Sequence, residues 1–455
     1  MHSDIFENTS RPQFLDRLTV ENPLYIFSTP FRDNNILTPQ KIQEIHDQLP
    51  QTKVILHLLC CTLFDNKEVD SIPPGKIQAD LQNTQAEFDN TLSNHRNIFM
   101  KNSTGGYVYY KIEKNGNYWF YEGDGYLADP GNTIYQEHLY NKIKHHVISS
   151  GYDGIYLDLM YPNFMQAFYY SKPFINGHEI TRNEWNNKLI SLSRYLQDRR
   201  QNDPDPKMKN ALIITNSVGG GPGDSLDPID RIQFNRDLQT QGVQIENPFQ
   251  NYQTTSTTAW LDTVNRIKDI SSLRNNSLGG WINYHQGEIT YPDQEACDDH
   301  GLFAYSSYLL ANQSPNFAFA FDCKMGAGDR QEPSQNLTHV RLGSALAPYQ
   351  KLSSGLYVCR FDHGFVLVNP TSGSLTYQPN LNLKNAYSST SYPKNTNITL
   401  PAKTGMVLLK EATSFSSDFN SDGTVNLLDY NLLKAGFGTT YNLLNYNTLR
   451  SQWGQ

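Results

Sequence analysis

Short apolar strands alternate with helical stretches about eight times over roughly 300 residues, and no other feature of the chain restricts the fold as strongly. Such repeats predict a parallel sheet joined by crossover helices. Eight repeats at this length favour a closed TIM (β/α)8 barrel over an open doubly wound sheet. No GxGxxG follows a first strand, which argues against a dinucleotide-binding fold. The expected strands are Leu24–Thr29, Lys53–Leu59, Asn97–Lys101, Ile155–Asp158, Ala211–Asn216, Val243–Glu246, Gly279–Tyr284 and Phe317–Asp322.

Towards the C-terminus the pattern changes to short strands separated by polar turns. Gly355–Phe361 and Phe365–Asn369 predict a hairpin, and Ile398–Leu400 and Gly405–Leu409 predict further strands. The last part of the chain contains two helical segments with similar sequences. We therefore expect a barrel domain over residues 1–335, an antiparallel β-sandwich-like domain over 336–412 and a small helical module over 413–455.

Two carboxylates come at the ends of predicted barrel strands, Asp158 on the fourth and Glu246 on the sixth. The carboxyl ends of barrel strands form the mouth where such enzymes place their chemistry. Two facing carboxyl groups can cleave a glycosidic bond, one protonating the leaving oxygen and the other attacking or activating water. We assign Asp158 as nucleophile or base and Glu246 as acid. The alternatives are that Asp158 accepts loop amides and that Glu246 pairs with Arg231 or Arg236.

Composition excludes several classes of protein. The net charge is −8 without a basic block, which argues against a nucleic-acid surface. The longest apolar run, Val54–Cys61, contains His57 and is too short to span a membrane. The first residues lack the apolar core of a signal peptide, so an intracellular protein or a trimmed N-terminus would explain them. Five cysteines without CxxC spacing predict buried thiols and not a disulfide framework or a zinc site.

The segment from Asp418 to Asp429 has the spacing of a calcium loop, with oxygen-bearing side chains at alternate positions and Gly423 at the sharp turn. A solvated turn rich in Asx residues is the alternative. If calcium binds, it is one structural ion. The expected ligands are Asp418, Asn420, Asp422, Thr424 (through its backbone carbonyl), Asn426 and Asp429.

Residues 427–438 align with residues 443–454, and together with the calcium loop this repeat resembles a type I dockerin. The second repeat lacks a calcium loop, because Thr439-Thr440-Tyr441-Asn442 offers few ligands. The resemblance implies a cohesin-like protein partner, with docking onto the chain itself as the alternative. It also implies an extracellular or cell-surface location, where calcium is abundant enough to fill a weak site.

The barrel region also resembles the glycoside hydrolase-like TIM-barrel families that carry a C-terminal β domain. The resemblance lies in residues 128–132, 151–158, 242–247, 343–346 and 365–370. It implies a glycosidase without specifying the sugar. It adds Asp129, Asn216 and Tyr284 as residues lining the cleft, and Asp153 as a subsite residue or one lying behind the site. His285 and Asp322, at predicted strand ends, are expected to bind sugar hydroxyls.

The sequence thus predicts a calcium-bearing glycoside hydrolase that acts on a poly- or oligosaccharide. Hydrolysis and transglycosylation, and retention and inversion, stay open. The alternative is a non-catalytic carbohydrate-binding or surface-structural protein on the same barrel. An open cleft that contains both Asp158 and Glu246 would favour the enzyme.

Overall fold

A computed structural model gives the architecture of the chain. It describes residues 25–28, 37–65, 83–109, 125–164, 169–218, 228–246, 248–249, 252–273, 280–284, 290–312, 318–321, 323–325, 330–331, 337–411, 419, 424–438, 440 and 443–453.

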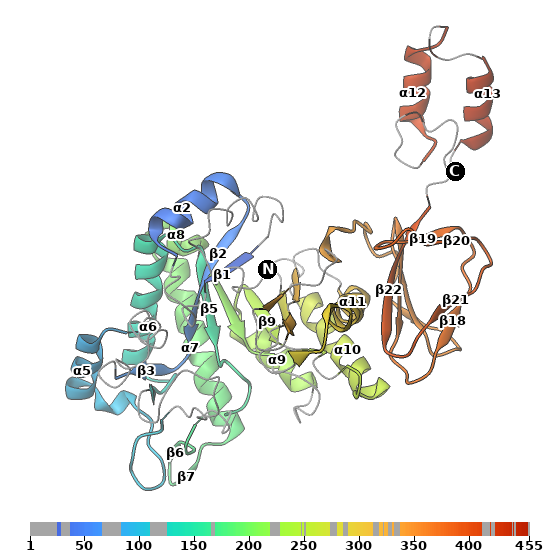
Figure 1. Ribbon diagram of the computed structural model, residues 1–455. Helices are drawn as coiled ribbons and strands as arrows, with labels where there is room; N and C mark the ends of the chain where they lie inside the picture. The colour runs from blue at the N-terminus through green and yellow to red at the C-terminus, as the bar shows by residue number, and fades with distance from the viewer. Residues whose placement is uncertain are drawn as a thin grey trace.

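The central element is a seven-stranded sheet in which every described pairing between neighbours is parallel (Figure 1). The strands lie side by side in chain order, as expected when a crossover helix follows each strand. Their bounds are β1 (Tyr25–Ser28), β2 (Lys53–Leu59), β5 (Gly154–Asp158), β8 (Leu212–Asn216), β9 (Gly242–Glu246), β10 (Gly280–Tyr284) and β12 (Ala318–Phe321).

One predicted barrel strand is wrong. Residues 97–101 do not join this sheet, because β2 pairs directly with β5 from Ile55–Gly154 to Leu59–Asp158. The segment begins in a 3-10 turn, Arg96–Ile98, and then makes single antiparallel bridges at Phe99 and Lys101. Its apolar residues are buried against α5 (Gln85–Asn94) and β4 (Gly125–Leu127), outside the sheet. Seven of the eight predicted strands are therefore present in the described part of the sheet.

The two faces of the sheet carry different residues. Ile155 and Leu157 belong to a large core shared with the helices, whereas Tyr156 packs with Ile55 and Ile214 in a separate small cluster. This alternation places one residue set under the helices and the next set on the inner face of the sheet. Strands buried on both faces are typical of parallel sheets.

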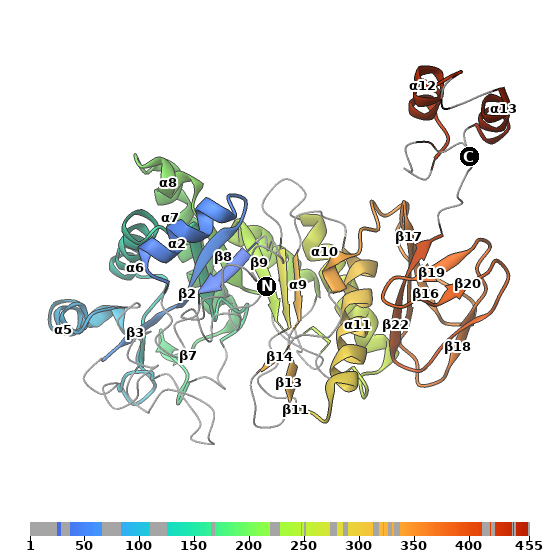
Figure 2. The ribbon, with the colours of Figure 1, turned by 45° about the horizontal axis from the view of Figure 1, so that its top comes forward.

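Eight helices precede the antiparallel domain within the described ranges, and one of them, α5, lies beside β3 and away from the sheet (Figures 1 and 2). Thr38 accepts a hydrogen bond from Lys41 N and Pro39 occupies the first turn, as the sequence predicts for the start of α2. Besides α5, the helices are α2 (Pro39–Gln48), α6 (Thr133–His145), α7 (Arg182–Asn202), α8 (Pro206–Asn210), α9 (Pro228–Leu238), α10 (Thr257–Leu273) and α11 (Gln294–Ala311).

Gly151 ends the helical segment before the strand that carries Asp158. Helix α6 continues as a π-helical turn, His146–Ser150, and Gly151 closes it with a φ of 86°. Glycine adopts this left-handed conformation without the clash that a side chain would cause. The chain can therefore turn directly from the helix into β5.

The predicted antiparallel domain is present and packs on the sheet domain. Its six strands follow the order β15-β16-β17-β22-β19-β20, and β18 pairs with β21 to cover one face. Gly405 of β22 lies against α11, where a Cβ atom would come within 2.5 Å of the Ser306 side chain. The strands are β15 (Gln350–Lys351), β16 (Tyr357–Arg360), β17 (Gly364–Asn369), β18 (Leu375–Tyr377), β19 (Leu383–Asn385), β20 (Ser391–Tyr392), β21 (Ile398–Leu400) and β22 (Thr404–Lys410).

The remaining short strands form small sheets outside the central one. Those sheets are β3 (Thr62–Phe64) with β4, β6 (Phe174–Ile175) with β7 (His178–Glu179), and β11 (Thr290–Tyr291) with β13 (Cys323–Met325) and β14 (Arg330–Gln331).

The C-terminal module consists of α12 (Leu427–Ala435) and α13 (Leu443–Gln452), which lie side by side (Figures 1 and 2). Val425, Leu433 and Leu449 form their small core. The repeat seen in the sequence thus corresponds to a pair of packed helices.

The cysteines differ in state. Cys60, Cys61 and Cys359 are free and buried, as predicted. Cys297 on α11 is disulfide-bonded, so the expectation of a buried thiol is wrong there. The spacing of cysteines along the chain carries no information about a pairing that folding creates between distant segments.

Candidate active site

Asp158 is the last residue of β5, where the strand reaches its carboxyl end. Its side chain is 21% exposed, above the cluster formed by Ile55, Tyr156 and Ile214 on the inner face of the sheet. An acidic side chain that stays partly accessible above an apolar floor is placed to react with a molecule entering from the strand ends.

Three donors surround the Asp158 carboxylate. Oδ1 accepts hydrogen bonds from Asn216 Nδ2 at 2.9 Å and from Leu159 N at 2.7 Å. Oδ2 lies 3.2 Å from His57 Nε2. Burial alone would raise the pKa of Asp158, but the hydrogen bond and charge of His57, with the Asn216 and Leu159 donors, hold that pKa below its ordinary value. Asp158 is therefore a carboxylate at neutral pH and a poor proton donor.

The backbone after Asp158 is shaped to deliver one of these donors. Leu159 has a φ of 61°, in the left-handed region that residues with a side chain rarely adopt. This turn directs the Leu159 N–H at the Asp158 carboxylate. Strained backbone of this kind persists where the surrounding structure enforces it, and it clusters at functional sites.

His57 is a site residue that the sequence reasoning missed. It lies in the middle of β2, with a side chain only 10% exposed, and its ring meets Tyr156 edge to face at 4.8 Å between centroids. The available signal was a single polar residue in the otherwise apolar run Val54–Cys61, two residues after the inward-facing Ile55. That spacing places His57 on the same face as Ile55.

Asn216, which the family resemblance implies as a residue lining the cleft, lies beside Asp158 in the structure. It ends β8 and is buried, and its amide donates both to Asp158 and to Tyr161 Oη at 2.9 Å. The alternative prediction, that Asp158 accepts hydrogen bonds from loop amides, explains only the contact with Leu159 N. The other two donors, His57 and Asn216, are side chains.

Glu246 is the last residue of β9, and it pairs in register with Asn283 of β10. Two residues earlier, Gln244 pairs with Asn216 of β8. Leu157 pairs with Thr215, so the next residues, Asp158 and Asn216, lie side by side, level with Gln244. Glu246 lies two residues further along its strand than this level. The contacts of the Glu246 side chain lie outside the described residues, so its predicted role and its alternative ion pair both stay predictions.

A buried histidine anchors the segment that follows Glu246. His300 of α11 donates from Nε2 to the Phe249 carbonyl at 3.0 Å, and its Nδ1 contacts the Tyr291 hydroxyl. Tyr252 stacks on the ring with centroids 4.0 Å apart. Burial lowers the pKa of His300 to about 3, although the bond to Phe249 opposes this shift. His300 is therefore neutral under most conditions and fixes the start of this loop.

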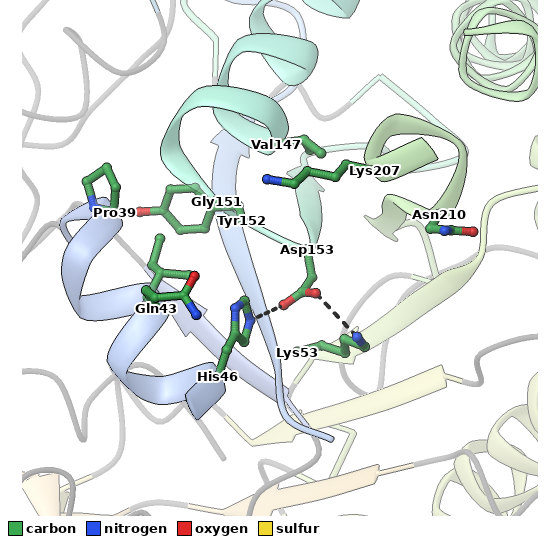
Figure 3. A pocket seen from close by; sticks show the side chains of 11 residues that line it. Pro39, Gln43, His46, Lys53, Val147, Gly151, Tyr152, Asp153, Lys207 and Asn210 are labelled. Atoms are coloured by element: carbon green, nitrogen blue, oxygen red, sulfur yellow. Dashed lines mark hydrogen bonds and ion pairs between the residues drawn. The ribbon is translucent and has the colours of Figure 1, made fainter. Parts of the chain in front are cut away.

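Asp153 does not belong to this site, and the subsite prediction for it is wrong. It precedes β5, five residues before Asp158, so the two lie at opposite ends of the strand, about 16 Å apart. Its carboxylate accepts from Val54 N at 2.8 Å, contacts His46 Nε2 at 2.8 Å and pairs with Lys53 Nζ at 3.3 Å (Figure 3).

Asp129 is occupied by contacts within the protein. Lys188 of α7 pairs with both its carboxylate oxygens, at 2.9 and 2.7 Å, and Gly131 N donates to Oδ1. Its side chain remains 23% exposed. The structure thus gives Asp129 a role in joining α7 to the turn before α6, and no described contact links it to Asp158.

Tyr284 ends β10 and pairs with Phe321 of β12, at the same end of the sheet as Asp158. Its side chain lies outside the described residues, as do His285 and Asp322 entirely.

Of the calcium loop, the structure describes Phe419 and residues 424–429, whereas Asp418, Asn420 and Asp422 lie outside the described residues. Asp429 is fully buried and accepts from Phe419 N at 2.7 Å and Asn426 N at 2.9 Å. Thr424 Oγ1 accepts from the Asn426 amide. A carboxylate oxygen that accepts one N–H keeps a second lone pair, so Asp429 still fits as a calcium ligand.

A comparison of the sequence with protein-family models identifies the family of the chain. Residues 68–365 match the model of hypothetical glycosyl hydrolase family 15. The chain belongs to this family. It is therefore a glycosidase, with a substrate that the family does not specify. The match includes Asp158, Asn216 and Glu246, and it begins after His57. No curated protein matches the chain at a significant level.

Solved structures show a distant overall likeness. The maltogenic α-amylase AmyB from Thermotoga neapolitana is 10% identical with a TM-score of 0.49, covering 90% of this chain and 97% of that chain. Amy13B from Eubacterium rectale has the same identity and TM-score, with coverages of 87% and 90%. An α-amylase from Geobacillus thermoleovorans, complexed with acarbose, is 11% identical with a TM-score of 0.44, covering 88% and 91%.

Proposed function

We propose that this glycosidase hydrolyses a poly- or oligosaccharide with Asp158 as nucleophile or base and Glu246 as general acid or base. The observation that supports this most is the state of Asp158. Three donors keep it ionised, which suits attack on an anomeric carbon or activation of water and does not suit proton donation. The acid must then be a second group, and Glu246 ends a strand of the same sheet.

The register supports the pairing of the two residues. Asp158 and Glu246 are separated by two strands across the sheet and by two residues along the strand direction. In a flat sheet these offsets place their Cα atoms about 12 Å apart. Side chains of their length can reduce this to the carboxyl separations of about 5–5.5 Å in retaining and 6.5–9.5 Å in inverting glycosidases. Either reaction is compatible with this placement.

We further propose that the sheet, of which seven strands are described, closes into a (β/α)8 barrel in which residues 97–101 are not the eighth strand. Its sequential strand order leaves β1 and β12 at the two edges, as in an unrolled barrel. Closure would bring Tyr284, His285 and Asp322 to the same mouth as Asp158, where they would bind sugar hydroxyls. Gln244 would assist from below, because its buried Oε1 has no hydrogen-bond partner among the described residues.

The experiment is a screen of α- and β-linked oligosaccharides and polysaccharides for release of reducing ends, followed by NMR of the first-formed anomer. Activity that disappears in Asp158→Asn, and persists in Asp198→Asn on the exposed face of α7, supports the proposal. Undiminished hydrolysis by Asp158→Asn would refute it. Adding sugar acceptors distinguishes hydrolysis from transglycosylation.

We propose that the C-terminal module binds one structural calcium ion through Asp418, Asn420, Asp422, Thr424, Asn426 and Asp429. Support comes from the loop spacing and from the buried Asp429 carboxylate. Calcium would supply the central charge around which the loop closes. Calorimetric titration of calcium into the full chain, with Asp429→Asn as control, tests this; heat equal in both proteins would refute it.

We propose that the same module docks a cohesin-like protein, or packs on its own chain, outside the cell. Among the described residues, six large apolar side chains are exposed on it, and apolar side chains gathered on so small a module are typical of an interaction surface. The disulfide at Cys297 fits an oxidising compartment. Crosslinking of the full chain with and without a cohesin tests the partner. The exposed side chains are Leu427, Leu428, Leu432, Phe437, Tyr446 and Trp453.

A further inference from the structure

A cavity of about 390 Å³ opens at the amino-terminal end of the sheet, remote from Asp158. It lies between α2, the start of β2, the turn before β5 and α8 (Figure 3). Its size falls within the range of small-molecule sites. Since Asp153 lines it and Asp158 ends the same strand, the cavity and the proposed catalytic site occupy opposite ends of β5.

The single carboxylate that lines this cavity is already engaged. Asp153 accepts from Val54 N and contacts His46 and Lys53, at distances of 2.8, 2.8 and 3.3 Å. These contacts join α2 and β2 to β5. They also hold the Lys53 ammonium at the cavity wall, where it balances the charge of Asp153.

Lys207 adds a positive charge to the cavity, and no acidic side chain among the described residues pairs with it. It reaches from α8 across the cavity towards Gly151 and Tyr152 (Figure 3). Among the described residues Lys207 takes part in no ion pair, whereas Lys53 pairs with Asp153. With Lys53 matched by Asp153, the lysine and aspartate side chains that line the cavity sum to a charge of about +1, within a chain whose net charge is −8.

Apart from the Asp153 carboxylate, which is engaged within the protein, the charged side chains that line the cavity are hydrogen-bond donors. Lys207 and Lys53 offer ammonium hydrogens, and the Asn210 amide lies at the rim. An ammonium group binds oxyanions as a compact point charge. We infer that this cavity binds a small oxyanion held by Lys207 and Lys53, a binding function separate from hydrolysis at Asp158. Inorganic phosphate and the carboxylate of a sugar acid share this chemistry.

Isothermal titration of the full chain at constant ionic strength tests the inference, with sodium phosphate and sodium glucuronate as probes. We expect saturable binding of at least one probe, and the one that binds identifies the source of the oxyanion. Lys207→Ala should weaken binding about tenfold, the effect of losing one charge-assisted hydrogen bond.

Lys209→Ala is the matched control, because Lys209 is also exposed on α8 and does not line the cavity. It should bind as the wild type does. The inference is overturned if neither probe saturates at millimolar concentration, or if Lys207→Ala and Lys209→Ala weaken binding equally. Hydrolysis measured in the same variants separates this result from the proposed function, since neither lysine is near Asp158.

Discussion

Replacing His57 with leucine should raise the pKa of Asp158 and shift the acid side of the pH–rate profile. The His57 contact of 3.2 Å is one of three that stabilise the carboxylate, leaving Asn216 and Leu159 in the variant. A hydrogen bond to a charged group contributes about 1.5–3 kcal/mol, which corresponds to a pKa rise of about 1–2 units. Leucine also removes a polar neighbour, which acts in the same direction.

The assay is kcat/KM against pH, because its acid limb reports groups of the free enzyme. The limb should move up by about 1–2 units, while the rate near neutral pH changes little. His57→Gln, which can still donate, should move it less. His178→Leu breaks an exposed histidine–carboxylate pair with Glu184 and should leave the limb unmoved. A folded His57→Leu enzyme with the wild-type limb would refute the coupling of His57 to Asp158.

Three further predictions concern other parts of the molecule. His300 has a pKa of about 3 in the folded protein, whereas in the unfolded chain it takes up a proton near pH 6.5. Protonation therefore favours the unfolded chain, and the free energy of unfolding should fall as the pH drops below 6.5. By pH 5 this loss is about 2 kcal/mol. In urea unfolding at pH 7 and pH 5, His300→Gln should lose about that much less stability between the two pH values than the wild type does. An equal loss in both proteins would contradict the prediction. Lys188→Met breaks the pair with Asp129, which should cost about 1 kcal/mol in urea unfolding and leave KM unaltered; a raised KM at wild-type stability would assign Asp129 to substrate binding. Chelating calcium should make the segment around Asp429 sensitive to protease until calcium, but not magnesium, is restored; equal cleavage in both states would remove the calcium proposal.

Local patterns predicted the elements around the site well. Apolar runs ending in Asp158, Asn216 and Glu246 are strands that end at those residues. Thr38-Pro39 starts a helix because both residues act locally, through a side-chain cap and a fixed φ. In each case the determining interaction lies within a few residues, so a single sequence contains it.

Longer-range features were not predictable in this way. Asp153 and Asp158 are close in sequence, yet a short strand separates them by its whole length. Residues 97–101 have the apolar character of a strand, but β2 and β5 pair with each other and leave no place between them. His57 stands out in the sequence as a polar residue within an apolar run, but its contact with Asp158 depends on the pairing of β2 with β5. The disulfide at Cys297 likewise depends on tertiary structure.

The most direct test of the carboxylate pair compares two variants on two kinds of substrate, an aryl glycoside with an activated leaving group and an unactivated oligosaccharide. Asp158→Asn should lower kcat/KM for both by about 10²–10⁴-fold, because attack or water activation is needed in each case. Glu246→Gln should lose activity on the oligosaccharide by a similar factor and retain most of it on the aryl glycoside, whose leaving group needs no proton. Wild-type kcat/KM for the oligosaccharide in either variant would contradict the assignment of Asp158 and Glu246 as the catalytic carboxylates.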